Sequence, residues 1–203
     1  MNSDNHRVDF FNQKAQGWNE NNPVPVGDLK RVIDLCRLEK GQAVLDIGTG
    51  NGRLVPFLLE AVGRKGQVVG VDPAEGMLAV ARQRHQSPNL SFVKAGAEDL
   101  PLGDGRFDTA ICYSVYPHFN DRKSAIAELK RVLKAGGLVA VAHTQGRQAI
   151  NSRHQRAGAA VKEDHLPPAS VVAGQFEQAG METVFSIDED DLYFVLARKP
   201  VYP

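Results

Sequence analysis

Three glycines and a downstream aspartate carry the first chemical signal in the sequence. Residues 44–52 read Val-Leu-Asp-Ile-Gly-Thr-Gly-Asn-Gly, so the glycines at 48, 50 and 52 directly follow a short apolar run. A loop without Cβ atoms turns sharply and lets a ligand approach the backbone. Asp72 ends the next apolar run, where a carboxylate can accept hydrogen bonds from both hydroxyls of a ribose. Together these features predict a nucleoside site.

Asp46 opens this loop and discriminates between nucleoside ligands. Dinucleotide sites usually space their glycines as G-x-G-x-x-G and keep negative charge away from the pyrophosphate, whereas the spacing here is G-x-G-x-G. A buried carboxylate would repel a pyrophosphate but suits a ligand with ammonium and sulfonium groups. The pattern favours S-adenosylmethionine. Two alternatives stay open: a nucleotide-dependent oxidoreductase, and a structural glycine turn with a solvated Asp72.

The elements that would position the loop are short apolar runs alternating with amphipathic stretches. Apolar residues at 29, 32, 33 and 36 have helical spacing, so a helix is expected from about Asp28 to Gly41. Strands are expected at 43–47, 67–71, 90–94, 107–113 and 138–143, with helices at 53–62, 75–85 and 121–133. The last of these helices is expected to be capped by Gly136 and Gly137. This alternation predicts a parallel sheet with helices on both faces.

The end of the chain departs from this alternation. A helix at 170–179 is followed by strands at 183–187 and 192–197, separated by an acidic turn. So short a connection requires an antiparallel pair. The predicted fold class is α/β, a doubly wound and mostly parallel sheet of seven strands with a C-terminal antiparallel hairpin. Residues 1–203 are expected to form a single domain, with residues 1–25 as an N-terminal cap.

Five segments of the chain also carry a family resemblance. They are VLDIGTGNG at 44–52, VVGVDPAEGML at 68–78, AGAEDLPL at 95–102, RFDTAICYSV at 106–115 and LKRVLKAGGLVAVAH at 129–143. In this order they resemble the motifs of class I S-adenosylmethionine-dependent methyltransferases, especially the group that includes the ubiquinone and menaquinone methyltransferases. The resemblance covers about residues 10–199 and implies a Rossmann-like fold.

The resemblance implies a role for each motif position. The loop glycines would line the methionine and ribose parts of the cofactor, and Asp72 would hold the ribose hydroxyls. The cofactor-binding residues implied in this way are Asp46, Gly48, Gly50, Gly52, Asp72, Pro73, Met77, Ala97, Glu98, Cys112, Tyr113 and Ser114. Of these, Ala97 and Glu98 would flank the adenine, Met77 would lie near its face, and residues 112–114 would lie beneath the sulfonium.

Two departures from the family pattern affect this assignment. Gly96 stands where similar proteins often have Asp, so the adenine amine would depend on Glu98 or on backbone carbonyls. Residues 112–115, Cys-Tyr-Ser-Val, differ from the Asn-Pro-Pro-Tyr pattern of enzymes that methylate amides and amines of nucleic acids or proteins. This difference favours a small-molecule acceptor.

Residues 144–168 are longer than a strand-to-helix connection needs, and we expect them to fold over the cofactor site as a lid. Apolar residues at 150, 157 and 161 share one helix face with His154. His118 follows the fourth expected strand and His143 ends the fifth. Both therefore lie at the carboxyl edge of the sheet, where doubly wound folds bind ligands.

These three histidines have three open interpretations. His118, His143 and His154 could bind a divalent metal, with Asp164 or His165 as a further ligand, although their long spacing is unlike that of zinc motifs. One of them could instead be the catalytic base that deprotonates the acceptor. The third interpretation is packing alone. Arg147 and Arg153 are candidates for binding an anionic group of the substrate, or else are solvated.

The predicted function is methyl transfer from S-adenosylmethionine to a small molecule by in-line displacement. The alternative is a non-catalytic S-adenosylmethionine-binding sensor or assembly protein, with or without a histidine metal site. Lys plus Arg equals Asp plus Glu at 24 each, which gives no basic surface for nucleic acid. No membrane-length apolar run and no signal peptide is expected, and two cysteines are too few for a disulfide framework. We expect a cytoplasmic protein without nucleic-acid or membrane partners; the oligomeric state stays open.

Overall fold

Short runs rich in Val, Ile and Leu form a seven-stranded sheet in the computed structural model, which describes residues 3–201. The strand order is β3-β2-β1-β4-β5-β7-β6. The first five strands in this order are parallel, and β7 pairs antiparallel with both β5 and β6. The strands are β1 (Ala43–Ile47), β2 (Gln67–Asp72), β3 (Leu90–Lys94), β4 (Phe107–Tyr113), β5 (Leu133–His143), β6 (Glu182–Asp188) and β7 (Tyr193–Arg198). The predicted fold class is confirmed.

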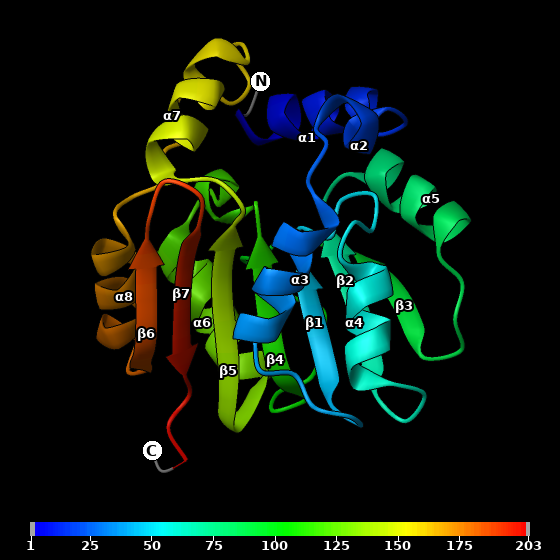
Figure 1. The fold of residues 1–203 in the computed structure, drawn as a ribbon, viewed down its shortest axis with the longest axis vertical. Helices are drawn as coiled ribbons and strands as arrows, with labels where there is room; N and C mark the ends of the chain where they lie inside the picture. The colour runs from blue at the N-terminus through cyan, green and yellow to red at the C-terminus, as the bar shows by residue number, and fades with distance from the viewer. Residues whose placement is uncertain (1–2, 202–203) are drawn as a thin grey trace.

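Helices cover both faces of this sheet (Figure 1). They are α1 (Ser3–Lys14), α2 (Trp18–Asn21), α3 (Val26–Leu35), α4 (Val55–Val62), α5 (Glu75–Arg84), the 3₁₀ turn η1 (Tyr116–His118), α6 (Arg122–Val132), α7 (Arg147–Arg156) and α8 (Ala169–Gln178). Within the described residues, no helix combines the length and the apolar character needed to cross a bilayer.

The two faces of the sheet bury separate apolar cores because successive strand residues point to opposite sides. In β4, Ala110 and Cys112 belong to the core that contains residues of α6 and α8. Ile111 and Tyr113 belong to the core that contains residues of α3 and α4. The near-continuous burial of the central strands is typical of a parallel sheet covered on both faces. Both cores hold the carboxyl ends of β1, β2 and β4 in fixed register.

The prediction that Gly136 and Gly137 cap the C-terminus of α6 is wrong. The helix begins after Asp121, which accepts hydrogen bonds from the backbone of Lys123 and Ser124, but it ends at Val132. Residue 133 is already extended and pairs with β4, so Gly136 and Gly137 lie inside β5. The apolar side chain at 133 is fully buried there. Pairing and burial of this residue outweigh the local preference of the two glycines for ending a helix.

Two other helices end earlier than their apolar spacing predicts. The helix α3 ends at Leu35 rather than near Gly41, and the intervening Arg37 adopts a left-handed backbone with φ +55°. The helix α7 ends at Arg156, so Ala157 lies beyond the helix and is exposed. The buried helix face predicted around His154 therefore covers fewer turns than expected.

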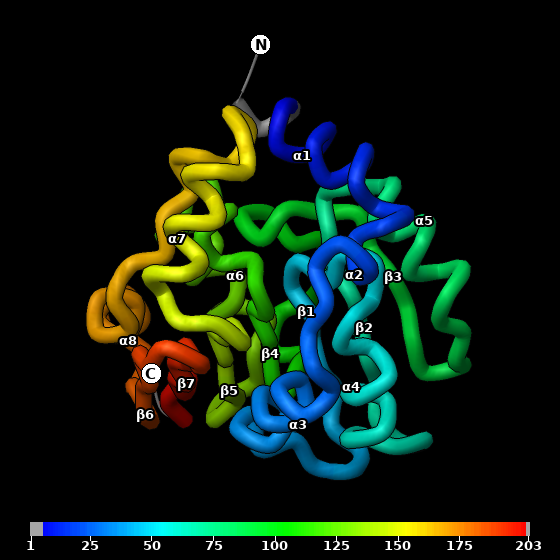
Figure 2. The backbone as a smooth tube through the Cα atoms, turned by 45° about the horizontal axis from the view of Figure 1, so that its top comes forward, coloured from blue at the N-terminus to red at the C-terminus, as the bar shows by residue number. Residues whose placement is uncertain are grey.

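The segments α1–α2 and α7 lie over the carboxyl edge of the sheet. Figure 1 shows them above the ends of the parallel strands, and Figure 2, with this edge turned forward, shows α1 and α7 as two separate segments over this edge. Their positions place two chain segments that are far apart in sequence beside the same ligand edge.

Candidate active site

A cavity of about 640 Å³ lies at this carboxyl edge. Its volume is within the range of small-molecule and cofactor sites. The predicted site residues that line it are Gly48, Gly50, Asp72, Pro73, Met77, Ala97, Glu98, Tyr113, Ser114, His118, His143 and His154. Asp46, Gly52 and Cys112 are buried beneath the wall instead of lining it. Most of the predicted residues thus come together around one cavity.

The glycine loop forms one wall of the cavity. Gly48 and Gly50 have φ values of +66° and +55°, a left-handed backbone that favours glycine. A Cβ on Gly48 would run into the side chain of Val115, so the loop packs directly against the end of β4. The backbone N–H of Thr49 donates to the carbonyl of Val71 at 3.0 Å, which joins the loop to β2. These contacts fix the loop backbone against two strand ends.

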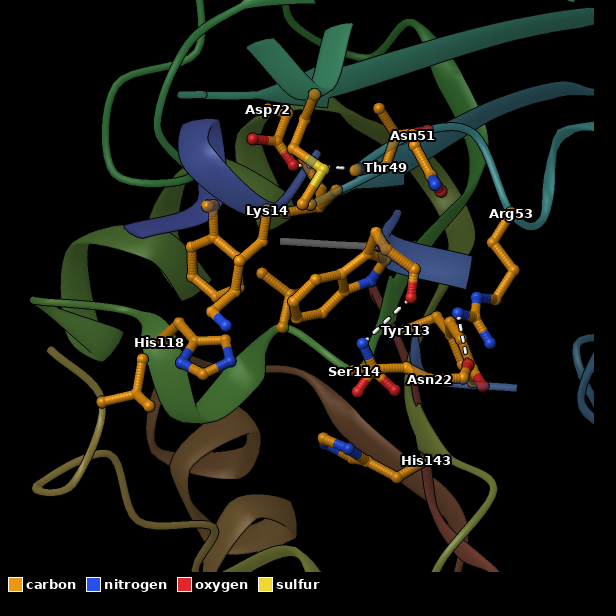
Figure 3. Close-up of a pocket in the computed structure, with 18 of the residues that line it drawn as sticks. Lys14, Asn22, Thr49, Asn51, Arg53, Asp72, Tyr113, Ser114, His118 and His143 are labelled. Atoms are coloured by element: carbon orange, nitrogen blue, oxygen red, sulfur yellow. Dashed lines mark hydrogen bonds between the residues drawn. The ribbon is translucent and has the colours of Figure 1, made fainter. Parts of the chain in front are cut away.

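Asp72 is tied to this loop at the end of β2. Its carboxylate accepts hydrogen bonds from the backbone N–H groups of Gly50 at 2.9 Å and Ala74 at 2.8 Å. Burial raises the pKa of Asp72 to about 6, although both hydrogen bonds act to lower it. Figure 3 shows Asp72 at one end of the cavity, close to Thr49 and far from His143. A ligand with hydroxyl donors could therefore reach this carboxylate from the cavity.

Asp46 supports the same loop from below. It is 2% exposed and accepts a hydrogen bond of 2.7 Å from the hydroxyl of Thr49. Burial raises its pKa to about 7, the Thr49 bond opposes this, and the neighbouring Asp72 adds to the rise. Two buried carboxylates without a described cation beside them create a local demand for positive charge. A cationic ligand near the loop would meet that demand.

Asn51 was not predicted as a site residue. It lines the cavity, is 1% exposed, and neither its amide nitrogen nor its amide oxygen has a hydrogen-bond partner among the described residues. Buried amides are normally satisfied, so these atoms are suited to a polar ligand group. The sequence held one sign that Asn51 belongs to the site, namely its position between Gly50 and Gly52. A side chain there must point away from the packed strand ends.

The side of the cavity near β3 provides a further carboxylate. Ala97 and Glu98 line this wall, and Glu98 accepts a hydrogen bond of 2.9 Å from the backbone N–H of Asn120. A Cβ on Gly96 would come within 2.9 Å of the Glu98 carboxylate, so a larger residue there would displace this side chain. Glycine at position 96 therefore leaves room for the carboxylate of Glu98.

His118 faces the opposite end of the cavity and is held by a carboxylate. Its Nδ1 lies 2.6 Å from Oδ2 of Asp164, which is also paired with Arg7 at 2.6 Å. Burial alone would raise the pKa of Asp164, but the hydrogen bond and positive charge of His118 and the charge of Arg7 lower it overall. An ionised carboxylate accepts the Nδ1 proton, so Nε2 is the basic nitrogen of the neutral ring.

The other two histidines differ from His118 in their hydrogen bonding. Nδ1 of His154 donates to the backbone carbonyl of Asp164 at 2.8 Å. His143 is 2% exposed, and neither ring nitrogen has a partner among the described residues. Burial, followed by the positive charges of His118, His154 and Arg153, lowers the pKa of His143 well below its ordinary value. His143 is therefore neutral at pH 7 and offers one donor and one acceptor.

The three histidines do not form the metal site considered above. Among the described residues, no group of three or more His, Cys, Asp or Glu side chains is arranged to hold a metal ion. The rings of His118 and His154 have centroids 5.0 Å apart, but Nδ1 of each ring is bound to a different atom of Asp164. His165 is exposed and does not line the cavity. Hydrogen bonds to Asp164 account for the positions of His118 and His154.

Aromatic side chains of the N-terminal segment complete the wall. Phe11 and Trp18 line the cavity with ring centroids 5.4 Å apart, and Phe11 also lies 5.2 Å edge-on from the His118 ring. The backbone of Gly76 donates to the Asn12 side chain at 2.8 Å, so α1 is fixed against α5. These aromatic residues were not predicted as site residues, although aromatic side chains in a polar segment were a usable signal.

Sequence comparison relates part of the chain to a known family. A protein-family model described as a methyltransferase domain matches residues 45–141, which include the glycine loop and Asp72. Residues 45–141 are a methyltransferase domain. The resemblance to S-adenosylmethionine-dependent methyltransferases predicted from the five motifs is confirmed.

Two curated relatives illustrate the similarity. A demethylmenaquinone methyltransferase of Staphylococcus epidermidis is 38% identical over 116 residues, which are 57% of this chain and 48% of the relative. A ubiquinone/menaquinone biosynthesis C-methyltransferase of Psychromonas ingrahamii is 36% identical over 113 residues, 54% of this chain and 45% of the relative. The chain thus spans about half the length of the curated relatives it matches.

Solved structures share the fold over more of the chain. An S-adenosylmethionine-dependent methyltransferase of Aquifex aeolicus has a TM-score of 0.70 and 25% identity, covering 84% of this chain and 89% of that chain. A chain from the complex of the Haloferax volcanii Trm112 methyltransferase activator with a methyltransferase has a TM-score of 0.80 and 19% identity, covering 96% of both chains. At this identity, the second likeness shows the fold alone.

Proposed function

We propose that this chain transfers a methyl group from S-adenosylmethionine to a small-molecule acceptor bound in the same cavity. The observation that carries the proposal is a cavity with two different ends. At one end the glycine loop is hydrogen-bonded to the Asp72 carboxylate, and at the other end Asp164 holds His118. One end suits a nucleoside, and at the other end His118 can take a proton from the methyl acceptor. The names of the curated relatives support a small-molecule acceptor.

The residues of the loop end would hold the cofactor. Asp72 would accept hydrogen bonds from the ribose hydroxyls, as its position at the end of β2 allows. Asn51 would supply its two unpartnered amide atoms to the amino-acid part. The other residues in this role are Gly48, Gly50, Pro73, Met77, Ala97, Glu98, Tyr113 and Ser114, all of which line the cavity. Asp46, Gly52 and Cys112 would act by supporting that wall from beneath.

The residues of the histidine end would prepare the acceptor. When bound, the cofactor supplies a methyl group on a sulfonium, so the bond from the acceptor atom to the methyl carbon forms as the carbon–sulfur bond breaks. His118 would take the acceptor's proton on Nε2, because Asp164 occupies Nδ1. His143 would orient the acceptor through a neutral hydrogen bond. Residues 1–25 and 144–168 would exclude water from this end as a cap and a lid.

Calorimetry with S-adenosylmethionine, NAD and NADP tests the cofactor assignment. We expect stoichiometric binding of S-adenosylmethionine and no binding of either dinucleotide; binding of a nicotinamide cofactor alone would contradict the proposal. Release of S-adenosylhomocysteine on adding candidate acceptors then tests catalysis. Binding without release for every acceptor, including quinones of the kind named for the relatives, would instead support a non-catalytic sensor or assembly protein.

A further inference from the structure

Two arginines reach the cavity from distant parts of the chain without an acidic partner. Arg53 follows the glycine loop and Arg153 lies on α7, and both side chains line the cavity. Arg53 donates to the backbone carbonyl of Asn22 at 2.7 Å, and Arg153 donates to the side-chain oxygen of Gln145 at 3.1 Å. Each guanidinium has five N–H donors, so most donors of both groups have no acceptor among the described side chains, residues 6–201.

The arginines that line the cavity differ in their partners. Among the described residues these are Arg7, Arg53 and Arg153, and Arg7 is paired with Asp164. Arg53 and Arg153 form no ion pair with any described residue, although Asp28, Asp72 and Glu98 line the same cavity. Two of the three cavity arginines thus carry a charge without a carboxylate partner.

The positive charge of this wall is poorly compensated. Arg53 is partly buried and its burial lowers the pKa of its guanidinium; Tyr113 opposes this and the charge of Arg153 adds to it. Arg153 is an exposed residue whose guanidinium is desolvated in part, which also lowers its pKa. Tyr113 lies near both groups, and its hydroxyl shares a hydrogen bond of 2.9 Å with Thr144. Figure 3 shows Arg53 beside Asn22 and Tyr113, on the side of the cavity away from His118. An anion between the two guanidinium groups would relieve their repulsion and accept their unused donors.

The adjoining wall indicates what kind of molecule carries this anion. Phe11, Trp18, Val115 and Ile150 line the same cavity, and Phe11 packs edge-on against the His118 ring. They give the cavity an apolar wall in addition to its charged groups. We propose that the methyl acceptor is an apolar ring compound bearing a carboxylate, and that Arg53 and Arg153 together bind this carboxylate. This assignment rests on the proposed methyl transfer and names the substrate class of the same cavity.

Matched aromatic probes test the assignment. Para-hydroxybenzoate and para-hydroxybenzamide share a ring and a hydroxyl but differ in charge. We expect calorimetry on protein saturated with S-adenosylhomocysteine to give tenfold or tighter binding of the carboxylate, roughly the value of one charged hydrogen bond. The preference should disappear in R53Q and in R153Q and partly return in R153K. R156Q is the control, because Arg156 is an exposed residue of the same helix that does not line the cavity.

Three results would overturn the assignment. The first is an unchanged preference in both Gln variants, and the second is absence of carboxylate binding to the wild-type complex. The third is weaker binding of S-adenosylhomocysteine in the Gln variants with unchanged binding of decarboxylated S-adenosylmethionine, which would mean that the arginines hold the cofactor's own carboxylate. If R53Q does not fold, R153Q and R153K decide the question. Failure of the proposed methyl transfer is distinguishable, because the wild-type protein would then not bind S-adenosylmethionine or not release its product.

Discussion

The two ends of the cavity are built in different ways. At the loop end, Gly50 follows β1 and Asp72 ends β2, 22 positions apart, and the backbone N–H of Gly50 donates to the Asp72 carboxylate. At the histidine end, Arg7, His118 and Asp164 come from three segments, with Arg7 and Asp164 separated by 157 positions. The loop end therefore follows from local sequence. The histidine end exists only after α1, η1 and the segment after α7 have packed together.

The two ends also differ in how much of them the family model covers. It matches residues 45–141, which contain the loop, Asp72 and His118 but neither Arg7 nor Asp164. Substitutions at the two ends should therefore separate cofactor binding from acceptor chemistry. The predictions below run from the largest expected effect to the smallest.

Removing the proposed base should have the largest effect and should leave the loop end intact. H118Q should lower kcat for methyl transfer by about 10²- to 10⁴-fold, the usual contribution of a positioned base. The Kd for S-adenosylmethionine should stay within about twofold. D164N should lower kcat less and move the pH profile, because Asp164 acts on the acceptor through His118, whose Nδ1 it holds. Equal loss of cofactor binding in H118Q would contradict the separation of the two ends.

Removing the carboxylate at the loop end should have the opposite signature. D72N should weaken S-adenosylmethionine binding by roughly a hundredfold, because two charged hydrogen bonds to the ribose are weakened. Calorimetry measures this directly. D34N is a matched control, since Asp34 is an exposed residue of α3 outside the cavity. An unchanged Kd in D72N would show that the ribose does not lie on this carboxylate.

The pH dependence of cofactor binding should also come from the loop end. Burial raises the pKa of Asp46 to about 7 and that of Asp72 to about 6, so both take up protons as the pH falls below 7. A cationic ligand favours their ionised forms, so its binding releases protons and its affinity should fall up to about tenfold per pH unit below 7. D46N should flatten the profile near pH 7; an unchanged profile in D46N would contradict the assignment of the pH dependence to this carboxylate.

The smallest expected effect concerns the contact between the two covering segments. Arg7 joins α1 to Asp164 and also donates to the backbone carbonyl of His118 at 3.1 Å. R7Q should speed hydrogen exchange in α1 and in residues 158–166 without changing exchange in β1 or β4. R31Q is the control, because Arg31 pairs with Asp191 at an exposed site. Faster exchange throughout the sheet would mean that Arg7 stabilises the whole fold rather than the cover.

The strands and the loop were predictable from sequence because each depends on local patterns. Apolar runs gave the strands, and the glycine spacing gave the loop beside Asp72. The end of α6 was not predictable, because the burial and pairing of Leu133 override the glycines that follow it. Local preference is decided there by tertiary contact.

The histidine end could be predicted only in part. The order of elements placed His118, His143 and His154 at one edge of the sheet, but it could not give their hydrogen-bond partners. The partner of His118 is Asp164, 46 positions away, and this pairing favours a base over a metal ligand. No spacing rule connects these residues, because an irregular segment rather than a helix or strand positions Asp164.

The structure of the complex with S-adenosylhomocysteine, determined by crystallography, tests the central claim most directly. The account predicts both ribose hydroxyls on the Asp72 carboxylate, with the sulfur directed toward the end of the cavity that holds His118. A nucleoside bound at the histidine end, or an Asp72 carboxylate without contact to the ribose, would contradict it.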